Sequence, residues 1–402
     1  MRAVVCGAGI AGLALAHCLC EHGWDVVVLE RAPGPREHGY MIDFWGPGFD
    51  AAEAMGLLPR LRERGYRIEG AGYYDDAGRL RATISYRQLA DAIGGDRLLS
   101  LLRPDLERTL RESLPDGADL RFGAGVVAVD VAVVDVGDGT GERVRVRTDG
   151  GEVFHADLLV GADGVHSTVR RLVFGPEPEF LRYLGYHTAA FVFDDPEVCD
   201  QVRGRFCLTD SVAAQLGFYG LRDGRVATFA VHRTPDPTLP PDHRAAVRRA
   251  YAALGWVAPR ALAACPPHGE VYYDQVAQIQ MPTWSRGRVT LVGDAGYAVS
   301  LLAGSGASLA VAGAYVLAQH LARADTVEDA LARYEQTWRP IVTAKQREAR
   351  TTARWFVPRT ATGVAVRRAV LRLSQLPGLD RRLGRLLTGK PTTVVQQLAH
   401  RS

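Results

Sequence analysis

The feature that most constrains this chain is the glycine-rich turn at residues 7–12, GAGIAG, which directly follows the apolar run 3–6. Residues 13–22 are rich in Ala and Leu and predict a helix, and residues 26–29 predict a second buried strand. Glu30 closes that strand, where its carboxylate can accept hydrogen bonds from ribose hydroxyls. This βαβ pattern predicts an α/β domain that binds a nucleotide.

Each glycine of the turn has its own role in such a unit. Gly7 permits the tight turn, Gly9 lets the backbone approach a pyrophosphate, and Gly12 lets helix and strand pack closely. The amino terminus of the helix that follows the turn supplies free N–H groups and positive partial charge, which favour phosphate.

Composition narrows the function classes. The chain has 402 residues, of which 47 % are hydrophobic and 23 % charged, with a formal net charge of +3. This excludes a disordered chain or a coiled coil, and gives no sign of a nucleic-acid partner. The six cysteines form no CxxC pair and no zinc spacing, so we expect no metal and a reducing, cytoplasmic location.

Two apolar stretches imitate membrane signals. The amino-terminal residues scan as a weak signal peptide, but the strand predicted at 24–30 favours the βαβ unit. Residues 295–322 contain no Asp, Glu, Lys or Arg and are long enough to span a bilayer. They are rich in Gly, Ala and Ser and directly follow Asp294, so we expect a buried loop and helix and no transmembrane segment.

The strand pattern changes along the chain. Residues 71–86 predict a hairpin, and long alternating runs follow at 186–193, 205–219 and 225–233. Residues 288–292 return to a buried strand. The predicted organisation is a discontinuous nucleotide-binding domain (1–70, 96–180 and 285–340), a second, sheet-based domain (71–95 and 181–284), and a basic helical segment (341–402).

The carboxyl-terminal segment is strongly basic. Residues 339–402 contain 14 Arg or Lys and two acids, so they carry +12, whereas the preceding residues carry −9. A helix there would place four apolar residues on one face: Val366, Val370, Leu373 and Leu376. Three arginines would lie elsewhere: Arg367, Arg368 and Arg372. Two interpretations stay open, a packing helix with a solvated basic face, or docking onto an acidic partner or an anionic membrane surface.

Two further strand-and-turn segments accompany the first motif. They are residues 157–170, DLLVGADGVHSTVR, and residues 288–295, RVTLVGDA. With residues 7–30 they resemble, in order and spacing, the three fingerprints of the single-component flavin-dependent aromatic hydroxylases. That family is typified by p-hydroxybenzoate hydroxylase and includes tetracycline-modifying monooxygenases. The resemblance spans roughly residues 1–340 and implies a Rossmann-like FAD-binding domain with an inserted β-sheet substrate domain.

The resemblance implies roles for individual residues. The glycine turn and Glu30 would hold the ADP half of FAD, Asp163 would contact its pyrophosphate side and help bind NAD(P)H, and Asp294 would contact ribityl or ribose hydroxyls. Arg103, at the start of a helix predicted at 103–113, is a further candidate FAD contact. Asp43, in the loop 39–45, and Arg31 are further candidate cofactor contacts, and for both of them a structural role is the alternative. The implied cofactor contacts are Gly7, Gly9, Ile10, Ala11, Gly12, Glu30, Arg31, Asp43, Arg103, Asp163, Gly164, Gly293, Asp294, Gly304, Gly306 and Ala307.

The chain departs from the family after the third strand. Relatives read GDAAHxxxPxxGQGxN where this chain reads GDAGYAVSLLAGSGAS, so Leu301 stands at the proline position. In the family that position supplies a carbonyl near the flavin C4a, and without proline the loop loses a fixed φ.

The resemblance implies that NAD(P)H reduces FAD and that O₂ adds at C4a. The resulting hydroperoxide then hydroxylates or epoxidises an aromatic or polyketide-like small molecule. Leu301 keeps open a flavin-dependent dehydrogenase or reductase without oxygen insertion. A non-catalytic flavin-binding protein acting through its basic segment is another alternative.

The catalytic side chains stay unknown, because the flavin would carry the chemistry. Alternation along 225–233 places Thr228 and His232 on one face, which would look into the pocket. These two and His187, on the preceding run, are the pocket candidates, with satisfied structural histidines as the alternative. A flavin-dependent halogenase is disfavoured, because the lysines are Lys345 and Lys390 and no WxW segment exists.

Overall fold

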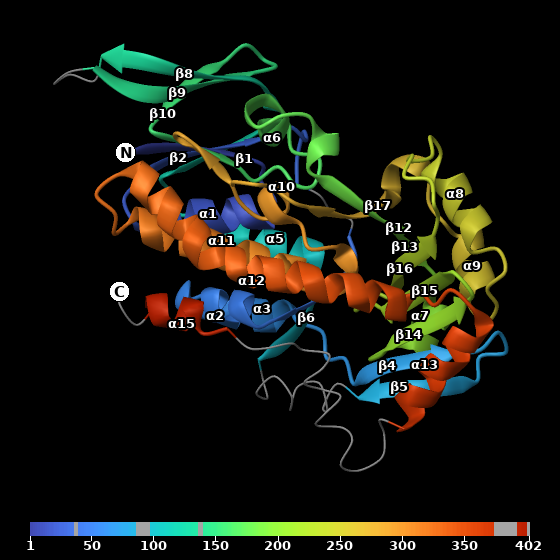
Figure 1. The fold of residues 1–402 in the computed structure, drawn as a ribbon. Helices are drawn as coiled ribbons and strands as arrows, with labels where there is room; N and C mark the ends of the chain where they lie inside the picture. Colours follow the sequence, from blue (N-terminus) through green and yellow to red (C-terminus); the bar gives the residue numbers. More distant parts are fainter. Residues whose placement is uncertain (36–38, 86–96, 136–139, 374–391, 400–402) are drawn as a thin grey trace.

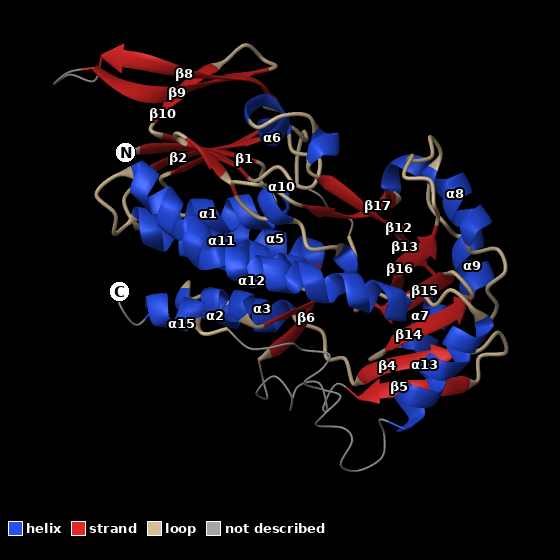
Figure 2. Cartoon of the chain, in the orientation of Figure 1, coloured by secondary structure: helices blue, strands red, loops and turns tan. Residues whose placement is uncertain are grey.

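The computed structural model describes residues 1–35, 39–85, 97–135, 140–373 and 392–399 (Figure 1). Two large sheets dominate it, and a layer of helices lies against the first of them (Figure 2). The longest helix, α12 (Val327–Phe356), runs from the first sheet to the second. This mixed helix-and-strand architecture confirms the predicted fold class.

The first sheet has the order β18-β19-β11-β1-β2-β7 and is parallel except for β18. Its central strands are short valine- and leucine-rich runs that are buried on both faces, as parallel strands covered by other layers must be. The strands are β1 (Arg2–Cys6), β2 (Asp25–Glu30), β7 (Ala118–Phe122), β11 (Leu158–Gly161), β18 (Ser285–Arg286) and β19 (Val289–Leu291).

Helices cover one face of this sheet, and a small sheet lies over the other (Figure 2). The covering helices are α1 (Ile10–Glu21), α5 (Arg103–Glu112) and α11 (Gly306–Leu321). The small sheet contains β8 (Val126–Asp135), β9 (Thr140–Thr148) and β10 (Val153–Ala156). A two-stranded sheet pairs β3 (Met41–Trp45) with β6 (Leu98–Leu102).

The second large sheet has the order β17-β12-β16-β15-β14-β4-β5, with β13 paired to β16. The hairpin predicted at 71–86 is present as β4 and β5. The single run expected at 205–219 is wrong, because a tight turn with Ala213 at φ 70° divides it into β14 and β15. The strands are β4 (Gly70–Tyr74), β5 (Leu80–Ser85), β12 (Leu181–Ala190), β13 (Val192–Asp194), β14 (Phe206–Ser211), β15 (Ala214–Gly220), β16 (Arg225–Arg233) and β17 (Tyr272–Ile279).

The remaining helices are short, apart from α13, and connect or flank the sheets. They are α2 (Pro47–Ala54), α3 (Leu58–Arg64), α6 (Thr168–Val173), η1 (Glu177–Glu179), α7 (Pro196–Val202), α8 (His243–Ala250), α9 (Ala258–Ala263), η2 (His268–Glu270), α10 (Asp294–Tyr297), η3 (Leu301–Ala303), α13 (Ala361–Leu373) and α15 (Val394–Ala399). The apolar stretch 295–322 is divided among α10, η3 and α11. Within the described residues, no helix is both long and apolar enough to cross a membrane.

The prediction of which face of α13 packs against the protein is wrong. Val366 is 50 % exposed, whereas Arg367 is 1 % exposed and faces the second sheet. Arg367 and Arg368 both pair with the buried carboxylate of Asp210 on β14. Two arginines assigned to a solvated basic face are therefore neutralised inside the protein. Leu376, the fourth residue of the predicted face, lies outside the described residues.

Candidate FAD and substrate site

The turn between β1 and α1 is built as a phosphate site. A Cβ on Gly12 would overlap the carbonyl oxygen of Gly7, and a Cβ on Gly7 would lie 2.6 Å from the carbonyl oxygen of Ala162. Gly9 differs, because a Cβ there would meet only Glu107 Oε1, at 3.7 Å. Gly9 also provides no side-chain cap for α1. The first N–H groups of α1 therefore face open space, as an incoming pyrophosphate requires.

Glu30 lies at the end of β2 beside this turn. Its Oε2 accepts a hydrogen bond from Ala8 N, and its Oε1 accepts one from Ala32 N, both at 2.9 Å. These bonds fix the carboxylate while leaving further lone pairs for a ribose hydroxyl. The neighbouring Arg31 is exposed.

Asp163 holds the loop that precedes α6. Its carboxylate accepts hydrogen bonds from Ser167 Oγ at 2.5 Å, Thr168 N at 2.7 Å and Val169 N at 3.1 Å. Burial raises the pKa of Asp163, while these hydrogen bonds lower it. The structure thus shows a loop-fixing function for Asp163, and it is Gly164 that reaches the adjacent cavity.

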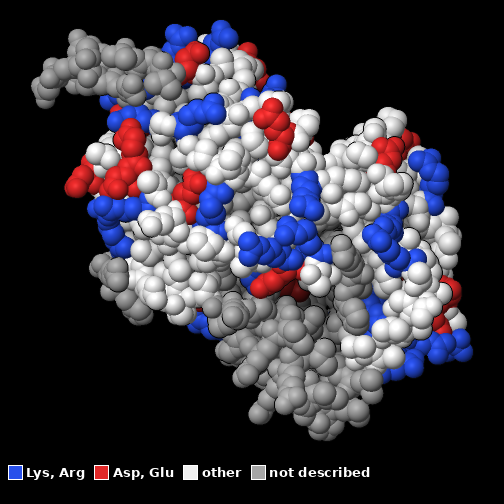
Figure 3. Space-filling model, in the orientation of Figure 1, with Lys and Arg blue, Asp and Glu red and all other residues white. Residues whose placement is uncertain are grey.

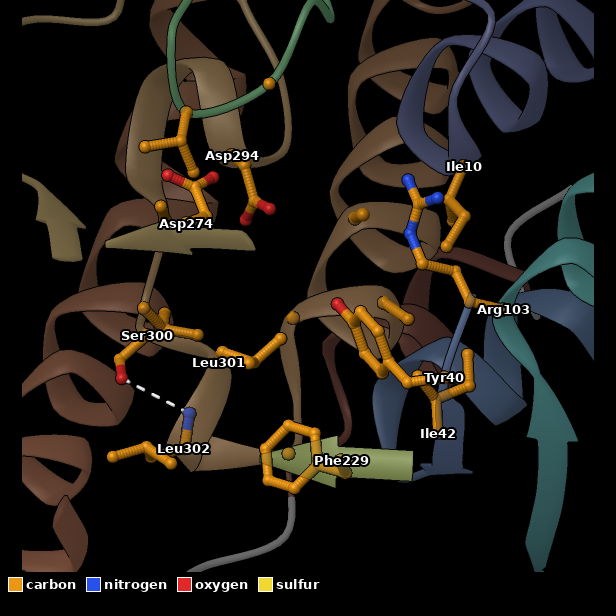
Figure 4. Close-up of a pocket in the computed structure, with 18 of the residues that line it drawn as sticks. Ile10, Tyr40, Ile42, Arg103, Phe229, Asp274, Asp294, Ser300, Leu301 and Leu302 are labelled. Carbon is orange, nitrogen blue, oxygen red and sulfur yellow. Dashed lines mark hydrogen bonds between the residues drawn. The ribbon is translucent and has the colours of Figure 1, made fainter. Parts of the chain in front are cut away.

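A cavity extends from the amino terminus of α1 toward the second sheet (Figure 4). Several predicted cofactor contacts from distant parts of the chain converge on it: Ile10, Ala11, Asp43, Arg103, Gly164, Asp294, Gly304, Gly306 and Ala307. The other predicted contacts lie outside its lining: Gly7, Gly9, Gly12, Glu30, Arg31, Asp163 and Gly293.

Two opposite charges face the cavity from different helices. Arg103, the first residue of α5, pairs with Glu107 at 2.7 Å, which fixes its guanidinium at the cavity wall. Asp294, the first residue of α10, has its side chain open to the cavity beside Asp274 of β17 (Figure 4). The enclosed position raises the pKa of Asp294, and the charge of Arg103 opposes that rise. These groups suit FAD. The carboxylate of Asp294 can accept hydrogen bonds from its hydroxyls, and the guanidinium of Arg103 and the free amino terminus of α1 can bind its phosphates.

The loop 298–304, which contains Leu301, is held without a proline. Ala298 O accepts hydrogen bonds from Ile279 N at 3.1 Å and from Gln346 Nε2 at 3.0 Å. Val299 O accepts one from Gln278 Nε2 at 3.0 Å. Ser300 is buried at φ 101°, and its Oγ accepts a bond from Leu302 N (Figure 4). This strained, tethered backbone fixes the loop by tertiary contacts rather than by local stiffness.

Aromatic side chains also line the cavity. The ring of Tyr40 lies 6.0 Å from Phe229 and 5.7 Å from Tyr272, measured between centroids. Phe206 and Tyr219 stack at 4.2 Å and line the same cavity. No pattern in the sequence predicted these rings, although the loop 39–45, which was expected beside the flavin, contains Tyr40.

The prediction that the Thr228 and His232 face of β16 looks into the pocket is wrong. Phe229 points into the cavity, so Thr228 and His232 occupy the other face of the sheet. Thr228 Oγ1 accepts from Phe191 N at 3.0 Å, and His232 Nδ1 lies 3.1 Å from the hydroxyl of Tyr251. His187 Nδ1 lies 3.2 Å from the hydroxyl of Tyr273 on that same face. These three candidates therefore do not line the cavity.

Two histidines make stability depend on pH in opposite directions, and together they favour a pH near 6.5. Burial lowers the pKa of His232 to about 4, so the unfolded state binds the proton first and stability falls as pH drops from about 6.5 to 4. Hydrogen bonding to Asp274, and then to Glu177, raises the pKa of His166 to about 9. That contribution is full below about pH 6.5 and is lost as pH rises through 9.

Urea unfolding at pH 5, 6.5 and 9 measures both contributions. His232→Asn should reduce the loss between pH 6.5 and 5, whereas His166→Gln should reduce the loss between pH 6.5 and 9. A variant whose pH dependence matches that of the wild type would contradict the assignment of that histidine.

Comparisons with known proteins agree with this geometry. A family model described as an FAD binding domain matches residues 1–349. An uncharacterised protein of Mycobacterium tuberculosis is 37 % identical over 352 residues, which cover 85 % of this chain and 91 % of that protein. An FAD-dependent monooxygenase of Sarocladium schorii is 30 % identical and covers 86 % of both chains.

The fold points to the same group. The crystal structure of a tetracycline destructase matches with a TM-score of 0.77 at 26 % identity, covering 96 % of this chain and 97 % of that one. The glycine turn with its open helix terminus, and the cavity that joins it to Arg103 and Asp294, supply the cofactor site that such relatives need. This chain therefore belongs to the FAD-binding domain family and is a flavoprotein of the FAD-dependent monooxygenase type.

Proposed function

We propose that this protein uses NADH or NADPH and dioxygen to insert one oxygen atom into an aromatic or polyketide-like small molecule. The observation that supports this most is a cavity lined by two chemically different sets of groups. One set is the α1 terminus with Arg103 and Asp294, and the other is a wall of aromatic side chains. A bound flavin and a planar substrate would thus share one enclosed space.

The chain's own residues divide the work of binding and shielding. FAD, when bound, supplies the redox chemistry with the nicotinamide and dioxygen. The N–H groups at Ile10 and Ala11 would bind its pyrophosphate, and the carboxylate of Asp294 would accept hydrogen bonds from its hydroxyls. The Tyr40 and Phe229 rings would orient the substrate plane and exclude water, which protects a reactive site from side reactions.

Leu301 is the observation that favours a second candidate, a flavin-dependent dehydrogenase or reductase without oxygen insertion. A proline would fix the loop locally, and leucine does not. The tethers from Gln278 and Gln346 nevertheless hold the loop carbonyls in place. We therefore favour oxygen insertion and test it against the alternative directly.

The test supplies FAD-loaded protein with NADPH or NADH under ¹⁸O₂ and a panel of phenols that includes tetracycline, the compound for which the structural relative is named. We expect nicotinamide oxidation and at least one product carrying a single ¹⁸O atom. A product that has lost two hydrogens without gaining ¹⁸O would identify a dehydrogenase. Oxidation of neither nucleotide, with or without the panel, would overturn the proposal.

A pair of variants links the product to the cavity. Phe229→Leu removes a ring from the cavity wall, so we expect a raised KM for the active phenol with the FAD content unchanged. Phe191→Leu makes the same change in the core on the other face of the sheet. It should lower stability while leaving that KM within about twofold, and an equal rise in both variants would contradict the assignment.

A further inference from the structure

A second cavity, of about 300 Å³, lies beside α12 and is lined by a different set of residues from the cavity that contains Arg103 and Asp294. Four arginines line it, Arg182 from β12 and Arg339, Arg347 and Arg350 from α12. The polar side chains of Gln280 and Thr343 add hydrogen-bonding groups, and no Asp or Glu belongs to its lining in the part of the chain that the structure describes. Basic side chains gather on the face that α12 crosses (Figure 3).

Two of these arginines are held in place by the protein. Arg339 donates to Met281 O at 2.8 Å, pairs with Glu335, and lies with its guanidinium 4.7 Å from the centre of the Trp284 ring. Arg350 donates to Gln278 Oε1 at 3.1 Å. Their positions are therefore set before any ligand arrives, which lowers the entropy cost of binding.

The other two, Arg182 and Arg347, are exposed, and among the described residues no Asp or Glu lines the cavity beside them. Arg339 is neutralised by Glu335, so an entering anion would balance the charges of the other three arginines. Planar guanidinium forks match phosphate oxygens in pairs, so phosphate is the anion that this arrangement favours.

We propose that this four-arginine cavity binds a small anion that carries phosphate. Its source is either a nicotinamide nucleotide, through the pyrophosphate or the 2′-phosphate, or free phosphate or pyrophosphate. Binding at this site does not depend on the reaction proposed for the first cavity.

The two cavities share a wall. Gln346 lines the four-arginine cavity and donates to Ala298 O, while Gln278, held by Arg350, donates to Val299 O. Ala298 and Val299 both line the first cavity. Gln278 and Gln346 therefore connect the four-arginine cavity to the loop 298–304, and we expect pyrophosphate bound there to alter the fluorescence of bound FAD.

Isothermal titration of FAD-loaded protein at low salt tests the site with pyrophosphate, NADP⁺ and NAD⁺ as probes. We expect Arg182→Gln combined with Arg347→Gln to raise the Kd for pyrophosphate at least tenfold, with unfolding and FAD content unchanged. The control is Arg249→Gln, an exposed arginine on α8, which should leave that Kd within twofold.

The outcomes are separable. A parallel loss of NADP⁺ affinity in the double variant identifies the nucleotide as the source, and a loss for pyrophosphate alone identifies free phosphate. Wild-type protein that binds none of the probes would overturn the proposal, as would binding that the double variant leaves intact.

Discussion

Replacing Asp210 by asparagine should lower the free energy of unfolding by about 3–5 kcal/mol, the cost of removing one partner from a buried ion pair. The Asp210 side chain is 0 % exposed and neutralises Arg367, which is 1 % exposed, and Arg368, at 2.5 Å. Arg367 also donates to Phe356 O at 2.5 Å and Gln215 Oε1 at 3.2 Å. Burial lowers the pKa of Arg367, yet its guanidinium stays charged, so without Asp210 a cation would remain inside the core.

Urea unfolding at pH 7 measures this effect, and a surface pair supplies its control. Glu197 pairs with Arg260 at 2.6 Å but is 73 % exposed. Glu197→Gln should therefore cost less than about 1 kcal/mol, because solvent screens exposed ion pairs. Equal losses in the two variants would show that burial does not set the strength of the Asp210 pair.

Gly9→Val should abolish tight FAD binding while leaving the protein folded. A Cβ at Gly9 meets only one side-chain oxygen, and the φ of −84° suits valine. The same side chain would fill the space above the α1 terminus that a pyrophosphate needs. We expect the Kd for FAD to rise at least a hundredfold, equivalent to about 2.7 kcal/mol, with an unfolding free energy within about 1 kcal/mol of wild-type apoprotein.

Fluorescence titration with FAD and urea unfolding of apoprotein measure the two quantities separately. Gly12→Ala is the matched comparison, because its Cβ would overlap the carbonyl oxygen of Gly7. That variant should lose stability and FAD together. A Gly9→Val protein that binds FAD with wild-type affinity would show that the cofactor does not lie over this turn.

The sequence by itself determined the elements whose signal is local. Apolar runs and glycine spacing were enough to predict the two strands and the glycine turn within residues 2–30. The helix α1 begins at Ile10, inside the turn itself and before the predicted start at residue 13. Arg103 and Asp294 were indicated by the family resemblance, and the structure places each at the first residue of a helix. Their convergence on one cavity follows from the order of the strands in the sheet. Short-range patterns in the sequence do not give that order, and only the family resemblance indicated it.

Side-chain direction in the second sheet was decided by tertiary structure. Alternation correctly placed Thr228 and His232 on one face of β16, but it does not say which face meets the flavin-binding part. When a strand turns its other face to the cavity, every residue expected to point inward points outward. Phe229 therefore lines the cavity in place of Thr228 and His232.

Local sequence patterns also could not predict which face of α13 is buried or that four arginines line one cavity. Hydrophobicity alone predicts that Val366 is buried and Arg367 exposed. The observed burial is the opposite, because Arg367 pairs with the carboxylate of Asp210, which lies 157 positions away in the chain. Arg182 likewise joins Arg347 and Arg350 only because β12 lies beside α12. Local periodicity determines which elements form, whereas the burial of a charge depends on a partner that the fold brings from a distant part of the sequence.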